Sequence, residues 1–436
     1  MSRISEEVAA LSPEQRELFE LLLKREGLDV SRLLASAGEA LASPVYLKED
    51  QLAPSHVFLT GATGYLGIHI LYQILRQTEA VAHCLVRASS KEEGRKRLAE
   101  QLAWYFPEEE LEHLLARINP VVGDLRAPRL DIDPDEYESL CSTIDFIYHA
   151  AADVRHIGDP AHFKAVNVDG TRSILALTRT GKEKFLHHIS TTLVAGAQSA
   201  PEITTFSERD FDINQHLWAL PYVQTKFLAE RVVRQAMVQG CRAVIHRTGA
   251  VSAHSHTGRF QRNIQDSMLY SFLRSIIKMG VAPYAPGISF DMIPVDFVAQ
   301  AIVKLSLTPR LEGETFHLVN PKQLDFYDLV RALQSLGYAI RLVDYEEYVD
   351  KLPTLNGQKN HPSELTAFLG YGDIINFKPL KIESALTQLQ LKRLGLECPP
   401  VTPRWLKLIL QHCIDVDYIE PPIRWDEFNS VVELFK

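Results

Sequence analysis

The chain has 436 residues, 46% of them hydrophobic, so it can bury a large core and is long enough for more than one domain. A formal net charge of -9 argues against a nucleic-acid binder. No stretch approaches about eighteen uninterrupted apolar residues, and the N-terminus lacks the apolar core of a signal peptide, so no membrane span is expected. The five scattered cysteines indicate free thiols in a reducing cytoplasm, with neither a metal site nor a disulfide framework.

Residues 1–53 are predicted to form a separate N-terminal helical segment. Ser12-Pro13-Glu14-Gln15 has the form of a capping box with proline at the first helical position, and apolar residues follow at helical spacing. We expect a helix from about Ser12 to about Gly27. Its apolar face needs a partner, which is either the main domain or another protein.

The stretch from His56 to Gly67 joins a strand-like apolar run to three glycines at a three-residue interval, with a helical run up to Leu75 after them. This pattern predicts a strand, a tight turn and a helix N-terminus that binds the pyrophosphate of a dinucleotide. The glycines permit the turn, the close approach of the phosphate and the packing of helix on strand. The expected cofactor contacts here are Gly61, Thr63, Gly64, Tyr65, Leu66 and Gly67.

A second strand, Val81–Val86, ends in a cation, Arg87. A domain selective for NAD places an acidic residue near this position to hold the ribose 2′-hydroxyl, so the arginine favours NADPH. The segment from Lys91 to Leu115 is predicted to be helical. Arg97 within it is a second candidate contact for the 2′-phosphate, with a solvated surface residue as the alternative.

Further strands are predicted at Val121–Leu125 and Ile144–His149, and another helix begins at Asn167. The acid at the end of the first of these strands is placed to accept a hydrogen bond from the adenine amino group. Small residues follow the second, where a flat cofactor lies against backbone. Alternating strands and helices require a parallel sheet. The expected cofactor contacts from these segments are Asp124, Leu125, Ala150, Ala151, Ala152 and Asn167.

Two segments suggest the chemistry. The strand Phe185–Thr192 ends in hydroxyls, and Tyr222 stands four residues before Lys226 at the start of a helix, so the two share one helical face. An ammonium beside a phenol is expected to lower the phenol pKa. The pair alone is a weak signal, but glycine loop, hydroxyl strand and Tyr-x-x-x-Lys helix occur here in order. The residues themselves leave open whether Thr191 or Thr192 joins the pair.

Together these segments resemble the extended short-chain dehydrogenase/reductase family, and more narrowly the thioester reductase domains of nonribosomal peptide synthetases and carboxylic acid reductases. The resemblance covers about residues 54 to 330. Thr248 departs from it, because such reductases usually have proline after the arginine. The segments that carry the resemblance are 60–67, 85–87, 123–125, 149–152, 188–191, 222–226, 247–249, 257–258 and 291–299.

The resemblance implies a Rossmann-type doubly wound α/β domain that binds NADP over residues 54–324 and a smaller, mostly helical substrate domain over 325–436. It also implies hydride transfer from NADPH to a carrier-bound acyl or peptidyl thioester, which releases an aldehyde, with further reduction to an alcohol left open. Tyr222 would donate the proton, Thr191 would bond the developing oxyanion, and Lys226 would hold the nicotinamide ribose and lower the phenol pKa.

The sequence contains no carrier-protein signature, so the carrier is expected to act in trans, or the chain is a piece of a larger synthetase. Two other functions stay open. A sugar-nucleotide epimerase or dehydratase would use the same residues with tightly held NAD, which Arg87 disfavours. A non-catalytic NADP-sensing protein would be expected to lack Tyr222 or Lys226, and both are present.

Overall fold

The computed structural model describes residues 51–155, 158–284, 289–351 and 378–422. The helix expected from Ser12 to Gly27, and almost all of the N-terminal segment 1–53, lie outside the described residues. The chain from Leu52 onward belongs to one compact unit. Within the described residues, no helix combines the length and the hydropathy needed to cross a membrane.

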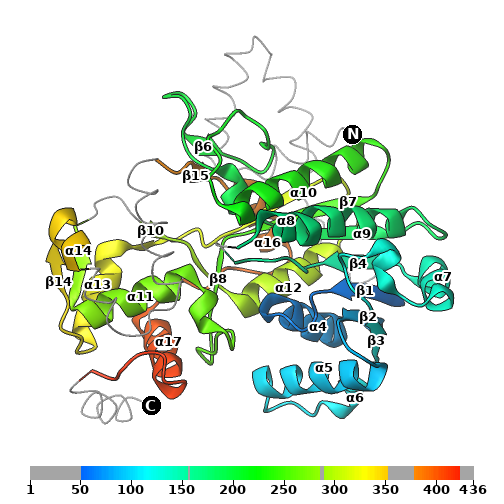
Figure 1. Ribbon diagram of the computed structural model, residues 1–436, viewed down its shortest axis with the longest axis horizontal. Helices are drawn as coiled ribbons and strands as arrows, with labels where there is room; N and C mark the ends of the chain where they lie inside the picture. Colours follow the sequence, from blue (N-terminus) through cyan, green and yellow to red (C-terminus); the bar gives the residue numbers. More distant parts are fainter. Residues whose placement is uncertain (1–50, 156–157, 285–288, 352–377, 423–436) are drawn as a thin grey trace, which may run out of the picture. The chain divides into compact units, whose positions relative to one another are not determined.

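The core of this unit is a seven-stranded sheet in which every pair of neighbours is parallel (Figure 1). Strand order reverses between β1 and β4, where an open α/β sheet forms its ligand crevice. The predicted Rossmann-type doubly wound fold is therefore confirmed. In spatial order the strands are β12 (Thr315–Leu318), β7 (Ala243–Thr248), β5 (Phe185–Thr191), β4 (Phe146–His149), β1 (His56–Thr60), β2 (Val81–Val86) and β3 (Ile118–Val122).

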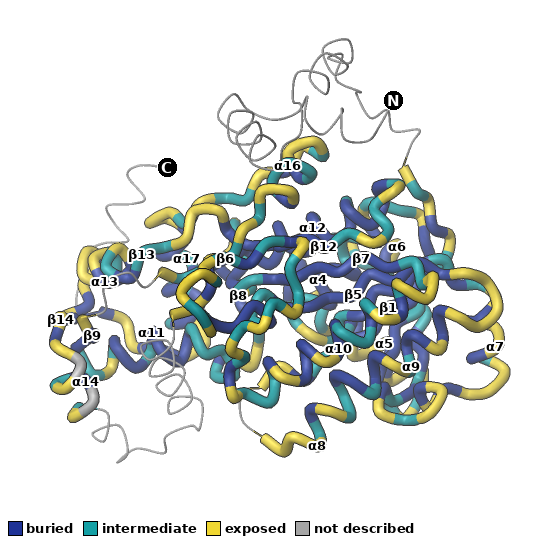
Figure 2. Tube along the Cα trace, turned by 90° about the horizontal axis from the view of Figure 1, so that it is seen from above, coloured by how far each residue is buried: buried dark blue, intermediate teal, exposed yellow. Residues whose placement is uncertain are grey.

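Both faces of the sheet are covered, which explains why a strand such as β1 has no polar face. On β1, Val57 and Leu59 point to one face and Phe58 to the other, and all three are fully buried. Figure 2 shows the same arrangement, with buried strands enclosed by helices that are exposed on their outer sides.

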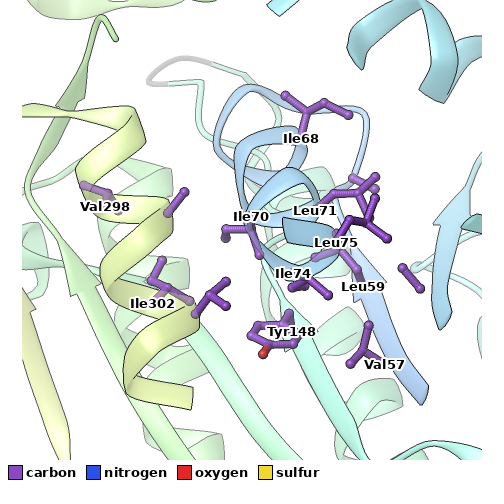
Figure 3. Close-up of a cluster of buried hydrophobic side chains, with 14 of the residues drawn as sticks. Val57, Leu59, Ile68, Ile70, Leu71, Ile74, Leu75, Tyr148, Val298 and Ile302 are labelled. Carbon is purple, nitrogen blue, oxygen red and sulfur yellow. The ribbon is translucent and has the colours of Figure 1, made fainter. Parts of the chain in front are cut away.

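Three helices cover the first face. Figure 3 shows Ile70 and Ile74 of one helix and Val298 and Ile302 of another packing over the strands beside Tyr148. These residues recur at intervals of four, which places them on one side of each helix. The helices are α4 (Tyr65–Gln77), α5 (Lys91–Tyr105) and α12 (Val295–Ser306).

The opposite face is covered by helices that include the one predicted to carry Tyr222 and Lys226. Ile174 and Val233 from these helices pack on Phe58, Leu186 and Ile245 of the sheet. The helices of this layer are α7 (Pro134–Thr143), the short α8 (Pro160–Phe163), α9 (Gly170–Thr178) and α10 (Pro221–Val238) (Figure 1).

Two boundary predictions were wrong. The helix expected from Lys91 to Leu115 is two helices, α5 and α6 (Glu112–Leu115), because Pro107 disfavours helical backbone at the residue before it and α5 ends there. The strand expected at Val121–Leu125 is β3, which ends at Val122. The chain then leaves the sheet, since the Asp124 N–H donates to the Leu130 carbonyl at 2.7 Å.

The helices after residue 325 pack in two places. The lobe that we call the helical lobe combines α11 (Met268–Met279), α13 (Phe326–Ser335), α14 (Tyr345–Lys351) and α17 (Pro403–Asp415) with the parallel pair β9 (Val281–Pro283) and β14 (Arg341–Val343). Since this lobe draws on both sides of residue 325, the domain boundaries stay a prediction.

The remaining helix, α16 (Ala385–Arg393), packs at the edge of the main sheet, where the His317 N–H of β12 donates to the Thr387 hydroxyl at 2.8 Å. Among the described residues the unit also contains three short strand pairs: β8 (Ala250–Ser252) with β11 (Met292–Pro294), β10 (Ser289–Phe290) with β13 (Leu324–Asp325), and β6 (Thr205–Phe206) with β15 (Lys381–Ile382).

Candidate active site

The glycine loop lies where β1 meets α4 and is held against the end of β4. A Cβ on Gly61, whose φ is +79°, would lie 2.7 Å from the Ala151 nitrogen, and one on Gly67 would lie 2.0 Å from the Gly61 carbonyl oxygen. Both positions therefore require glycine. A Cβ on Gly64 would meet only the Gly61 carbonyl oxygen, at 3.2 Å, so backbone here is open to a ligand.

The N-terminus of α4 fits a pyrophosphate. Gly64 is its N-cap, no side chain caps its free N–H groups, and its first turn carries no acidic residue. Free N–H groups and the helix dipole favour an anion at this position. The Tyr65 hydroxyl donates instead to the Ser252 carbonyl, at 2.9 Å, so any contact of Tyr65 with a cofactor would be made by its backbone.

At the end of the crevice where the adenosine contacts are predicted, Arg126 adds a third basic group to Arg87 and Arg97. Arg87 is exposed directly after β2, and the Arg97 guanidinium donates to its backbone carbonyl. Arg97 thus braces the Arg87 backbone. The Asp124 carboxylate accepts from Arg126 Nε at 3.0 Å and Nη2 at 2.5 Å, and this contact lowers the pKa of Asp124. Leu125 is buried in the core, so only its backbone could face a cofactor.

His149, at the end of β4, was not among the residues predicted to act at the site. Its Nδ1 lies 2.8 Å from the Thr60 hydroxyl and its Nε2 lies 3.0 Å from the Thr171 hydroxyl. The Thr171 hydroxyl donates to the Asn167 carbonyl, and the Thr60 hydroxyl accepts from the Ala151 N–H. The proton therefore sits on Nε2, and burial, which lowers the pKa of His149 to about 3, keeps the ring neutral.

Asn167 links the chain after β4 to α10, the helix that bears Tyr222. It lies in a π-helical segment, Lys164–Asp169, and does not open an α-helix as expected. Its side chain exchanges two hydrogen bonds with the Asp153 backbone and donates to the Thr225 hydroxyl at 3.0 Å. The amide is thereby occupied within the protein, and Ala150, Ala151 and Ala152 stay partly exposed beside it.

The three predicted catalytic side chains converge at the carboxyl end of β5. The side chains of Thr191 and Tyr222 hydrogen-bond, and the Lys226 ammonium donates to the Ile189 carbonyl at 2.7 Å. Thr192 faces elsewhere, because its hydroxyl donates to the Thr248 carbonyl at 3.4 Å. The geometry therefore favours Thr191 over Thr192, a choice that the residues alone left open.

A family described as "Male sterility protein" matches residues 59–302, which is more than half of the chain. The chain belongs to this family. It is 33% identical over 406 residues to a component of the linear gramicidin synthase of Brevibacillus parabrevis, a match that covers 90% of this chain and 8% of that protein. This relation identifies a domain, since the chain spans less than a tenth of that protein.

Two solved structures narrow the relation to reductase domains. The terminal R domain from the myxalamid PKS-NRPS pathway superposes with a TM-score of 0.76 and 30% identity, covering 85% of this chain and 93% of that one. A thiolation-reductase di-domain from an archaeal nonribosomal peptide synthetase gives 0.74 and 30%, covering 85% and 77%. The chain is thus a reductase domain of the extended short-chain dehydrogenase/reductase superfamily, with a fold for a nicotinamide cofactor.

One electrostatic expectation was wrong. Lys226 was expected to lower the pKa of Tyr222, but burial raises that pKa to about 12, offset only in part by the hydrogen bond with Thr191. The lysine instead directs a proton at the Ile189 carbonyl. A raised pKa keeps the phenol protonated at neutral pH, which suits a group that donates a proton.

The reductase domain should lose turnover as Lys226 loses its proton. Burial lowers the pKa of Lys226 to about 8, opposed by the charge of Glu230, so the ammonium is present below that pH and absent above it. We expect kcat to fall as pH rises through about 8. In Lys226→Arg, whose guanidinium stays charged, this limb should disappear even if overall activity is lower. A pH–rate profile from 6 to 10 measures both, and a parental kcat that is flat to pH 10 contradicts the role of the charge.

Proposed function

We propose that this reductase domain uses NADPH to reduce a carrier-bound acyl or peptidyl thioester to an aldehyde. The observation that carries the proposal is the convergence of Thr191, Tyr222 and Lys226 beside the glycine loop, in a chain that belongs to a reductase family. NADPH, when bound, supplies the hydride. The glycine loop and the uncapped start of α4 would hold its pyrophosphate, and Lys226 would hold the nicotinamide ribose.

The protein side of the reaction is proton transfer and charge stabilisation. Hydride addition to the thioester carbon leaves negative charge on the carbonyl oxygen. Tyr222 would donate its phenolic proton to this oxygen, and the Thr191 hydroxyl would hydrogen-bond it as the charge develops. The resulting thiohemiacetal then breaks its C–S bond, which gives an aldehyde and the free carrier thiol.

We also propose that the substrate arrives on a phosphopantetheinylated carrier protein, which is either a separate protein or part of a larger synthetase chain. A thiolation domain and a reductase domain share one chain in the archaeal di-domain, which shows that such partners occur together in that protein.

All five cysteines of the present chain are free. Free thiols are consistent with the cytoplasmic location that we propose.

A carrier-bound substrate should be preferred. We expect a lower apparent KM for an acyl group on a separate carrier protein than for the same acyl group on free pantetheine, with similar kcat, because docking adds binding energy remote from the reacting carbonyl. Steady-state kinetics with both substrates measure this. Equal KM values contradict docking. Where the carrier-bound substrate is preferred, deletion of residues 1–48 shows whether this preference depends on the N-terminal segment.

Cofactor preference depends on Arg87. A charge-assisted hydrogen bond to the 2′-phosphate contributes roughly 1.5 to 3 kcal/mol, so NADPH should bind about tenfold to a hundredfold more tightly than NADH. Arg87→Ala should reduce this ratio, whereas Arg76→Ala, which removes an exposed arginine paired with Glu109, should leave it unchanged. Titration of each variant with both cofactors decides, and equal affinity of the parental protein for the two would overturn the assignment.

The general acid is tested by Tyr222→Phe, which removes the hydroxyl and keeps the ring. We expect kcat to fall about 10²- to 10⁴-fold with NADPH binding nearly unchanged. Lys226→Ala should lower both kcat and NADPH affinity. Tyr148→Phe is the matched control, because its buried hydroxyl contacts Ser306, 2.6 Å away, on the other face of the sheet. Turnover, NADPH titration and melting curves measure these effects. A near-parental kcat in Tyr222→Phe would contradict the proposed role of Tyr222 as the general acid.

A further inference from the structure

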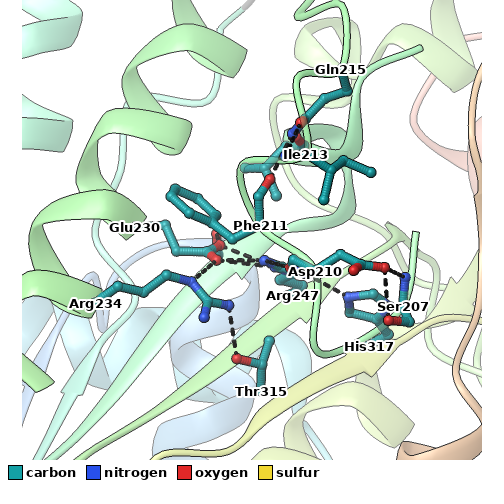
Figure 4. A network of polar contacts seen from close by, with 12 residues as sticks. Ser207, Asp210, Phe211, Ile213, Gln215, Glu230, Arg234, Arg247, Thr315 and His317 are labelled. Carbon is teal, nitrogen blue, oxygen red and sulfur yellow. Dashed lines mark hydrogen bonds and ion pairs between the residues drawn. The ribbon is translucent and has the colours of Figure 1, made fainter. Parts of the chain in front are cut away.

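A buried carboxylate lies directly behind the catalytic residues. Glu230 follows Lys226 by one turn of α10 and is fully buried, as is Arg247 on β7. Its Oε1 accepts from Arg247 Nη2 at 2.7 Å and from Arg234 Nε at 2.9 Å (Figure 4). Burial raises the pKa of Glu230, but the two arginines outweigh it and the carboxylate is charged.

The second carboxylate oxygen reaches the catalytic strand. Oε2 of Glu230 accepts from the Ser190 hydroxyl at 2.7 Å, and Ser190 is the residue before Thr191. Three consecutive residues of β5 are therefore each bonded to α10, and the helix residues that bond them are four apart. Ile189 is bonded by Lys226, Ser190 by Glu230, and Thr191 by Tyr222. This pattern fixes the register of the helix on the strand.

Arg247 contacts several other groups besides Glu230. These contacts fix its guanidinium and therefore also the carboxylate that pairs with it. Its Nη1 lies 2.9 Å from His317 Nε2 on β12, and its Nη2 donates to the Asp210 carbonyl at 2.7 Å. Its guanidinium also lies over the Phe206 ring, 4.7 Å from the ring centre. Figure 4 shows His317 from β12 and Asp210 from the chain before α10 lying around Arg247.

The charge of Glu230 also acts on Lys226. The other titratable groups that face this lysine are His149 from β4, His188 from β5 and Tyr222 from α10 itself. Burial lowers the pKa of both histidines and raises that of the tyrosine, so all three are neutral at pH 7. Among the described residues, the negative charge whose field favours the Lys226 ammonium is that of Glu230.

We propose that Glu230 is a positioning residue of the active site: fixed by Arg247, its carboxylate sets the register of α10 on β5 through Ser190 and places a negative charge one helical turn from Lys226. The proposal rests on the catalytic roles proposed for Thr191, Tyr222 and Lys226. Glu230 itself is too deeply buried to touch a substrate. Its effect is transmitted through the groups that do.

The register is tested by Ser190→Ala, which removes one hydroxyl and leaves the ion pair intact. We expect kcat to fall about tenfold with unchanged NADPH affinity, because a small misplacement of reacting groups is costly. Ser306→Ala is the matched control, since it also removes a buried hydroxyl, on α12 across the sheet. It should show a similar melting temperature and parental kcat. Parental kcat in Ser190→Ala, or an equal loss in both variants, would overturn the role of Glu230 in register.

The charge is tested by Glu230→Gln, which keeps the shape of the side chain. Loss of the negative charge should move the alkaline limb of kcat to lower pH by about one unit. An unmoved limb in a folded variant would overturn the electrostatic part, and the Ser190→Ala comparison decides the register even if Glu230→Gln fails to fold. Tyr222→Phe in the same assay distinguishes failure of the catalytic assignment from failure of the positioning role. Near-parental turnover there refutes the catalytic assignment, whereas a large loss there combined with parental behaviour of Ser190→Ala and Glu230→Gln refutes only the positioning role.

Discussion

The close approach of backbone to backbone between the glycine loop and the end of β4 is the constraint on which the site depends. Gly61 lies so near Ala151 that no side chain fits between them, and Gly67 lies as near to Gly61. These contacts place the start of α4 at the point where strand order reverses. A cofactor held there would lie across the ends of β4 and β5, beside the proposed catalytic side chains.

Behind this surface the protein buries polar groups that are costly without partners. His149 is satisfied by two threonines, Asn167 by the Asp153 backbone and Thr225, and Glu230 by two arginines and Ser190. Each of these side chains joins segments far apart in the sequence. The hydrogen bonds therefore do more than satisfy buried atoms, because they join the chain after β4, strand β5 and helix α10 into one arrangement.

The sequence was most informative where local rules decide. The glycine spacing predicted β1, the turn and α4, and alternation predicted the parallel sheet. It was less informative where a partner lies far along the chain. Tyr222, Lys226 and Glu230 stand at intervals of four, which is visible in the sequence, but the pairing of Glu230 with Arg247 becomes visible only in the fold. The choice between Thr191 and Thr192 likewise needed the direction in which each hydroxyl points.

The expectation for the pKa of Tyr222 was wrong for the same reason, since the burial of the phenol depends on residues far along the chain. From the sequence, a lysine one turn away stabilises the phenolate by its charge, and burial does not enter. In the folded chain burial is the larger effect on both groups, raising the pKa of the phenol to about 12 and lowering that of the ammonium to about 8. With a pKa of about 8, the Lys226 ammonium is charged at neutral pH and loses its proton at only slightly higher pH. The buried carboxylate of Glu230 favours the ammonium form of this lysine. A carboxylate buried so deeply requires a partner of opposite charge, which is Arg247 on the neighbouring strand.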